Sequence, residues 1–329
     1  MQHHPTRRHV LLATLATTAL GPLGLQPAQA QPAPASSGAP LRIIVATPAG
    51  GASDTAARLI GQSLAKAQGR QVLVENKPGG NGVPAVQAVL NAPADGQTLL
   101  WAQSSMAGMP MLVKSPPIKS LADFVPVAPV VNLVYGVVVN PKVPASTVAE
   151  LTAHLKSHPD QLSYGTGVLS EYMVTLHYLR AAGLKAVRVP YKGGAQLMPD
   201  LISGELQFNI GPLAPALPHV KSGKLRLLAT LPDRAEIVPG VPSLADAGIA
   251  TDTLQTWNGL VAPPGTPPEV AAHLAQAVNR ALADPTVRAS LEAQGLRVSG
   301  GTPQQLGAAI ESATTAWRQF IRDHDIPQE

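Results

Sequence analysis

The chain has 329 residues, of which 45% are hydrophobic and 13% charged, so it can build a folded core and is not an intrinsically disordered protein. It contains no cysteine, which excludes thiol catalysis, disulfides and cysteine-ligated metals. The formal charge is +4, but without Arg7 and Arg8 only 22 scattered basic residues face 20 acidic ones, so no nucleic-acid partner is expected.

Residues 1–30 have the pattern of a signal peptide. Two adjacent arginines precede an apolar stretch from Val10 to Leu25, and Ala28-Gln29-Ala30 offers the small residues that signal peptidase recognises. The stretch is too short and too interrupted for a membrane anchor. We therefore expect a periplasmic protein, cleaved near Ala30 after export by the Sec or twin-arginine route. Residues 31–40 should form a flexible mature N-terminus.

From residue 41 the chain alternates apolar runs with amphipathic segments, a pattern typical of βαβ units around a parallel sheet. The first strands are expected at 41–46, 72–75 and 98–102, with helices from about 53 and from 83 to 90. After a strand at 134–140 the pattern resumes, with helices at 147–157, 170–182, 195–203 and 214–222 and strands at 162–164, 186–189, 206–210 and 225–229.

The segment after a strand at 257–262 is expected to be purely helical, over 268–283, 285–294 and 303–322. Helices without strands of their own must dock on an existing sheet. We therefore predict an α/β fold of two lobes joined by two hinge strands, with the C-terminal helices docked on lobe one. Lobe one is expected to cover 41–138 plus 258–329, and lobe two 139–257.

The segment Pro48 to Asp54 follows the first strand and begins the first helix. Glycines allow a ligand to approach the backbone, and the first N–H groups of a helix carry partial positive charge, so the segment predicts an anion site. A plain turn capped by Ser53 or Asp54 is the alternative. The candidate ligand contacts are Thr47, Ala49, Gly50, Gly51 and Asp54.

Other candidate contacts follow other strands. Ser104 and Ser105 follow the third strand, and Gly211 follows the strand near 206–210. In lobe two, Thr166, Gly167 and Ser170 lie in a small-residue loop before a helix, which mirrors the first loop. Two helix N-termini facing a cleft would suit a ligand with carboxylates at both ends.

No cofactor or metal is expected. Residues 80–85 fit G-x-G-x-x-A, but the next strand ends without an acidic residue for a ribose, so a nucleotide site is not predicted. No hydrolase elbow, zinc motif or P-loop occurs. A non-enzymatic receptor is therefore favoured over an enzyme using Ser104, Asp54 or Glu171.

These segments resemble the solute receptors of tripartite tricarboxylate transporters, the Bug family. The match runs in order through almost all of the chain after residue 40. Its motifs are P-x-G-G-x-x-D-x-x-A-R at 48–58, V-E-N-x-P-G-x-x-G at 74–82, D-G-x-T-L-L at 95–100, V-P-Y-K-G at 189–193, S-G-K-L-R-x-L-A at 222–229, W-N-G-L-V-A-P at 257–263 and G-T-P at 265–267.

The resemblance implies a type II periplasmic-binding-protein fold and a receptor that captures a small carboxylate for membrane permease subunits. It implies a monomer that binds its ligand largely through backbone N–H groups of the two loops. A sensor that signals to a histidine kinase is an alternative. One departure concerns the second loop, which is shorter than in the family and carries Glu171 and Tyr172. Glu171 would repel a second carboxylate, whereas it could pair with an amino group.

Overall fold

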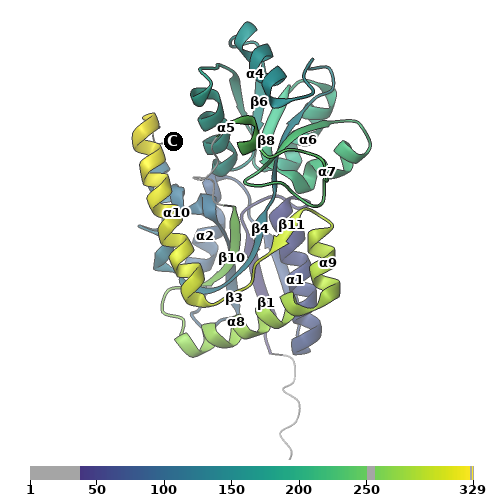
Figure 1. The fold of residues 1–329 in the computed structure, drawn as a ribbon. Coiled ribbons are helices and arrows are strands. Elements are labelled where there is room, and N and C mark those ends of the chain that lie inside the picture. Colours follow the sequence, from purple (N-terminus) through teal and green to yellow (C-terminus); the bar gives the residue numbers. More distant parts are fainter. Residues whose placement is uncertain (1–37, 250–255, 327, 329) are drawn as a thin grey trace, which may run out of the picture. The chain divides into compact units, whose positions relative to one another are not determined.

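The computed structural model describes residues 38–249, 256–326 and 328. Within these residues the chain forms two β-sheets, each covered by helices (Figure 1). The signal peptide and most of the flexible segment predicted at the N-terminus lie outside the described residues. No helix in the described part of the chain is long and apolar enough to span a membrane.

The first sheet has six strands in the order β11-β4-β10-β3-β1-β2. β1, β2 and β3 are parallel, whereas β10 runs antiparallel to both β3 and β4, and β11 runs antiparallel to β4. The strands of the first sheet cover Leu41–Val45 (β1), Val72–Asn76 (β2), Thr98–Gln103 (β3), Val125–Leu133 (β4), Trp257–Ala262 (β10) and Leu296–Val298 (β11).

The second sheet has five strands in the order β7-β6-β8-β5-β9. Its strands cover Tyr135–Val139 (β5), Ser163–Thr166 (β6), Val187–Pro190 (β7), Phe208–Pro212 (β8) and Arg226–Leu231 (β9). β6 is parallel to both of its neighbours, and β5 is antiparallel to both of its own. We call each sheet with its covering helices a lobe.

The α-helices follow the expected strand–helix alternation. They cover Ala52–Gln68 (α1), Val83–Leu90 (α2), Met109–Leu112 (α3), Val148–Ser157 (α4), Leu169–Ala181 (α5), Gly194–Ser203 (α6), Leu213–Lys221 (α7), Pro268–Ala283 (α8), Pro285–Glu292 (α9) and Pro303–His324 (α10). Short 3-10 helices lie at Gly80–Gly82 (η1), Ser104–Gly108 (η2), Leu121–Asp123 (η3) and Ala245–Ala247 (η4).

The chain crosses from the first sheet to the second at Val134, between β4 and β5. The sequence analysis placed this crossing after residue 138, but Tyr135–Val139 pairs with β8 and β9 in the second sheet. The chain returns before Trp257, which pairs with Asn132 in the first sheet rather than ending lobe two.

Two strands were absent from the sequence analysis. β4 contains Pro126 and Pro129, and prolines weaken the sequence signal of a strand. Its pairing with β10 has irregularities next to both prolines. β11 has three residues, so the C-terminal region is not purely helical as expected. The prediction that its helices dock on lobe one is confirmed, because α8 and α10 both pack against β4.

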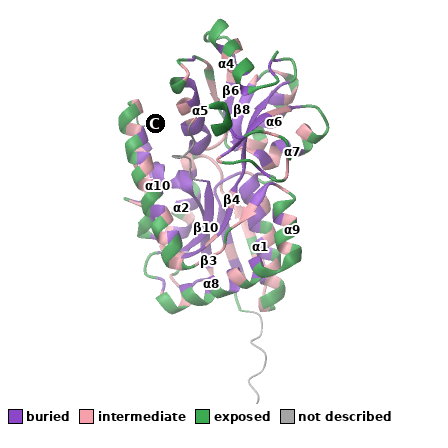
Figure 2. Ribbon diagram, viewed as in Figure 1, coloured by how far each residue is buried: buried purple, intermediate pink, exposed green. Residues whose placement is uncertain are grey.

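The strands of both sheets are largely buried, whereas the helices expose one face (Figure 2). In α10 the buried residues recur at helical spacing, at Leu306, Ile310, Ala313, Trp317 and Phe320. This apolar stripe packs in a cluster that also contains Leu169 and Met173 of α5. Apolar contacts therefore link the two lobes.

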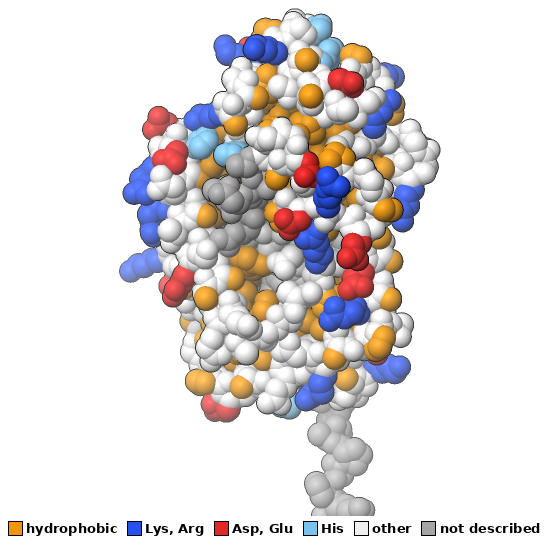
Figure 3. All heavy atoms as spheres, viewed as in Figure 1, with side chains coloured by type: hydrophobic (Ala, Val, Ile, Leu, Met, Phe, Trp, Pro, Cys, Tyr) orange, Lys and Arg blue, Asp and Glu red, His pale blue; other side chains and the backbone are white. Residues whose placement is uncertain are grey.

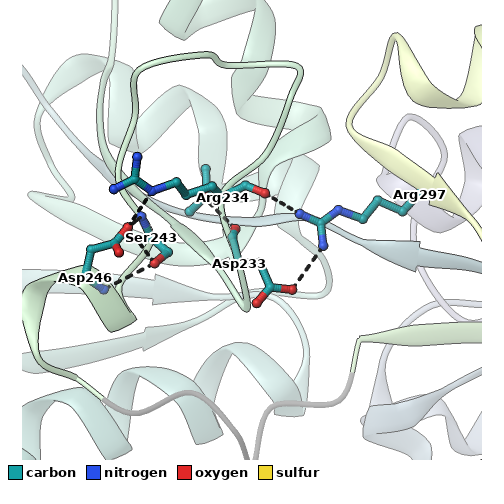
Figure 4. A network of polar contacts seen from close by, with 6 residues as sticks. Asp233, Arg234, Ser243, Asp246 and Arg297 are labelled. Atoms are coloured by element: carbon teal, nitrogen blue, oxygen red, sulfur yellow. Dashed lines mark hydrogen bonds and ion pairs between the residues drawn. The ribbon is translucent and has the colours of Figure 1, made fainter.

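A polar network also joins the lobes through Arg297 of β11 (Figure 4). Its guanidinium donates to the backbone carbonyl of Arg234 at 2.6 Å and pairs with Asp233 at 3.3 Å, in the segment that follows β9. Asp246 holds that segment by accepting hydrogen bonds from Arg234 and Ser243. These pairs are exposed, so they orient the segment more than they stabilise the fold. In Figure 3, basic and acidic side chains are interspersed on the face shown.

Candidate ligand-binding site

A pocket lies between the two lobes, at the ends of several strands. Its empty space, counted together with the part open to solvent, is about 490 Å³. The first lobe lines it with Thr47, Pro48, Gly51, Ala52, Ser53, Gln103, Ser104, Ser105, Leu133, Thr256 and Asn258. The second lobe lines it with Tyr135, Val168, Ser170, Glu171, Gly194, Ala195, Pro212 and Pro215.

The N-terminus of α1 opens into this pocket. Its N-cap residue is Gly51, and no side chain caps the helix, so Ser53 and Asp54 do not play the capping role considered above. Thr47 is 7% exposed and lines the pocket, yet its Oγ1 has no hydrogen-bond partner among the described residues. An uncapped helix start beside an unpaired buried hydroxyl suits an anionic group of a ligand.

Asp54 does not line the pocket. It is 3% exposed, and its Oδ2 accepts hydrogen bonds from the Gly50 N–H and the Arg58 guanidinium, both at 3.0 Å. Its Oδ1 accepts one from Asn76 at 2.9 Å. Burial raises the pKa of Asp54, but these hydrogen bonds outweigh it and hold the pKa below its ordinary value. The carboxylate thus fixes Gly50, whose φ of +82° favours glycine, and so shapes the loop before α1.

We expect Asp54→Ala to lower the free energy of unfolding by roughly 2 kcal/mol, because it leaves three donors without their acceptor. Urea denaturation at pH 7 measures this change. Glu292→Ala is the control, since it removes an exposed pair with Arg288 and should cost less than about 1 kcal/mol. Equal effects of the two substitutions would show that Asp54 does not organise the loop.

A network of buried polar side chains lies on the first-lobe side of the pocket. The side-chain carbonyl of Asn258 accepts hydrogen bonds from Ser53 Oγ and Trp101 Nε1, both at 2.8 Å. Gln103 Nε2 donates to Ser53 Oγ at 2.5 Å. Of these residues, Ser53, Gln103 and Asn258 line the pocket. The sequence analysis did not predict them as contacts, because β10 brings Asn258 beside a residue 205 positions earlier.

The predicted contacts divide into two groups. Thr47, Gly51, Ser104, Ser105 and Ser170 line the pocket. The other predicted contacts do not line it: Ala49, Gly50, Asp54, Thr166, Gly167 and Gly211. Thr166 Oγ1 accepts a hydrogen bond from Arg188 at 3.0 Å, and Gly167 lines an adjoining pocket with Ser105. Whether either group contacts a ligand stays a prediction.

Glu171 is the most unusual group in the pocket. It is 1% exposed, and its Oε2 accepts a 2.5 Å hydrogen bond from the Gly167 N–H at the start of α5. Burial raises the pKa of Glu171 to about 7, although hydrogen bonds from Gly167, Asn209 and Val168 lower it in part. Beside it, the hydroxyl groups of Tyr135 and Ser170 lie 2.7 Å apart. The second-lobe helix start is therefore occupied by a carboxylate of the protein itself.

The raised pKa makes stability depend on pH. Folding favours the protonated form of Glu171. The stability that this protonation adds to the folded state is therefore fully present below about pH 4.5 and is lost as pH rises through about 7. We expect the difference in unfolding free energy between wild type and Glu171→Gln to fall by up to roughly 3 kcal/mol from pH 4.5 to 8.5. Urea unfolding of both proteins across this range tests it. A difference that stays constant with pH would contradict the assignment.

The lobes touch beside the pocket, whose lining includes Pro48 and Gly194. A Cβ added to Gly193, just before α6, would lie 2.5 Å from Cδ of Pro48 in the first lobe. Gly193 has an extended backbone, with φ of 170°, so sterics across the lobes, not backbone strain, favour glycine there. The contact brings together the segments that follow β1 and β7.

The described residues contain no group of three or more His, Asp or Glu side chains that could hold a metal ion. Among the described residues that line the pocket, Glu171 is the one Asp or Glu, and none is a His. The lining therefore pairs no serine with a histidine base.

Two α/β lobes with a pocket between them are the architecture of a two-lobed solute-binding protein. The chain belongs to the tripartite tricarboxylate transporter receptor family, whose sequence pattern matches residues 56–326. It is 32% identical over 289 residues to Protein BugT of Bordetella pertussis, a match that covers 86% of this chain and 89% of BugT.

Solved structures agree with this membership. The periplasmic binding protein BugD superposes with a TM-score of 0.82 at 25% identity, covering 88% of this chain and 99% of BugD. Rpa4515 of R. palustris, solved with adipate, superposes with a TM-score of 0.83 at 26% identity, covering 88% of this chain and 98% of Rpa4515. The predicted periplasmic-binding-protein fold and the predicted family are thus confirmed.

Proposed function

We propose that this chain is a periplasmic receptor that binds a small carboxylate between its two lobes and delivers it to permease subunits of a tripartite transporter. The observation that carries the proposal is the uncapped start of α1 beside the unpaired Thr47 hydroxyl, inside an interlobe pocket. The adipate bound to the related Rpa4515 supports a carboxylate as the ligand class. The leader pattern of residues 1–30 supports export and cleavage near Ala30.

The receptor is proposed to bind its ligand without converting it. The described residues of the pocket lining include serines but no histidine base, and the one carboxylate among them, Glu171, is hydrogen-bonded to the backbone. Binding would favour the state in which the lobes touch, since a ligand that contacts both lobes is bound more tightly there.

The proposal is tested with the protein purified after export. Each of a panel of mono-, di- and tricarboxylates and amino acids is added, and the thermal midpoint and the binding heat are measured. A ligand at about 100 times its Kd should stabilise the protein by roughly 2.7 kcal/mol. The bound compound should be recovered chemically unchanged. Turnover of the bound acid would point to an enzyme, and the absence of any carboxylate ligand, added or co-purified, would overturn the proposal.

A further inference from the structure

The two helix starts that face the pocket are not equivalent. The start of α1 has no side-chain cap and lies beside the unpaired Thr47 hydroxyl. At the start of α5, the Glu171 carboxylate already accepts the Gly167 N–H. The first lobe therefore offers donors to an anion, whereas the second lobe presents a carboxylate. This asymmetry does not fit a ligand with a carboxylate at each end.

No cation among the described residues forms an ion pair with Glu171. No neighbouring positive charge is among the causes that shift the pKa of its carboxyl group. Of the elements around it, β5 brings Tyr135 and β6 brings Tyr164, while β8 and η2 contain no Asp, Glu, Lys, Arg or His. A buried carboxylate without a cation is unfavourable in its charged form, and an incoming cation would remove that penalty.

The second oxygen of this carboxylate, Oε1, packs closely against glycine backbone. Two glycines, Gly194 and Gly211, lie next to Glu171 Oε1, and a Cβ on them would stand 3.4 and 3.0 Å from that atom. Gly194 lines the pocket as well. Neither residue has a side chain that would block a small donor group, and the Asn209 side chain, which hydrogen-bonds the Glu171 carboxylate, lies on the Gly211 side.

We propose that Glu171 selects an amino carboxylate: the ligand carboxylate binds at the start of α1 and its ammonium group pairs with Glu171 in the second lobe. This inference rests on the proposed receptor function and adds the ligand class to it. A dicarboxylate of the same length would bring its second negative charge against Glu171 and bind more weakly.

The experiment compares Kd values by calorimetry at pH 8, after the protein has been unfolded and refolded to remove any bound compound. The probes are the standard amino acids, ω-amino acids with two to five methylenes, and dicarboxylates with the same numbers of methylenes. The variant is Glu171→Gln, which keeps an oxygen to accept the Gly167 N–H but has no charge.

The chain supplies a matched control in Glu150→Gln. Glu150 Oε2 also accepts a backbone N–H from four residues earlier, that of Ser146 at 2.6 Å, but it lies at the exposed start of α4 and not in the pocket. A change that reflects helix capping alone would appear in both variants. A change in ligand choice should appear in Glu171→Gln only.

We expect wild type to bind an amino carboxylate at least 10-fold more tightly than the matched dicarboxylate. Glu171→Gln should lose at least 10-fold for the amino carboxylate and reduce or reverse the preference, whereas Glu150→Gln should keep it. Wild type preferring a dicarboxylate over every amino carboxylate, or an unchanged preference in Glu171→Gln, would overturn the inference and leave the receptor function standing. If no probe binds wild type or either variant, the proposed receptor function itself fails.

Discussion

Replacing Gly51 with valine is expected to abolish carboxylate binding while the protein stays folded. A Cβ at this position would stand 3.7 Å from Thr47 Oγ1 and 3.4 Å from the Pro48 carbonyl, both ordinary contacts. The backbone angles of Gly51, φ −75° and ψ 165°, are open to any residue, so the substitution adds no backbone strain. The two methyl groups beyond Cβ, however, must occupy the side of the pocket where the proposed carboxylate meets the α1 N–H groups.

Calorimetric titration with the best ligand of the wild type measures the effect. We expect an affinity loss of roughly 100-fold or more, which corresponds to about 3 kcal/mol of binding free energy. Gly38→Val is the control, because Gly38 is exposed and nothing lies within 4 Å of an added Cβ. Unchanged affinity in Gly51→Val, with the fold intact by circular dichroism, would exclude the start of α1 as the anchor.

The second large effect is expected from Gly193→Ala. One added methyl group would lie 2.5 Å from Pro48 Cδ, and the three atoms nearest to it all belong to Pro48 in the opposite lobe. The substitution should therefore oppose contact between the lobes without disturbing the packing within the second lobe. We expect roughly 10-fold weaker ligand binding or more, because the population of the binding-competent state falls.

A double-mutant cycle separates this steric effect from other causes. Pro48→Ala removes Cγ and Cδ, the two ring atoms that the new methyl would meet, so Gly193→Ala should cost much less affinity in that background. Small-angle scattering with and without ligand should show less compaction for Gly193→Ala alone. Additive effects of the two substitutions would indicate that this contact does not govern lobe closure.

The resemblance of the short sequence motifs to one receptor family was sufficient to predict the family and the fold. Each motif is a local arrangement of glycine, proline and polar residues around a strand end. The local structure that it forms can therefore be predicted without knowledge of distant contacts. The glycine loop between β1 and α1 is such a case. The strand signal failed at β4, where two prolines interrupt the apolar run and the pairing strand β10 accommodates them with irregular register.

The site was predicted less completely, because the sequence gives the order of residues but not the direction of their side chains. Asp54 stood in the predicted anion loop, yet its carboxylate turns to Gly50, Arg58 and Asn76 and supports the loop instead. Gly211 was predicted as a contact, and it lies beside Glu171 rather than in the pocket lining. Such roles depend on which neighbour satisfies each buried polar group.

By itself, the sequence determined the alternation of strands and helices, the presence of a glycine loop before α1, and the presence of an acidic residue near the start of α5. These features follow from local periodicity and backbone preference. Only the tertiary structure decided that Asn258 meets Ser53 across 205 residues, that Gly193 meets Pro48 between the lobes, and that Glu171 is buried without a cationic partner among the residues that the structure describes. These three properties arise from packing between segments far apart in the chain.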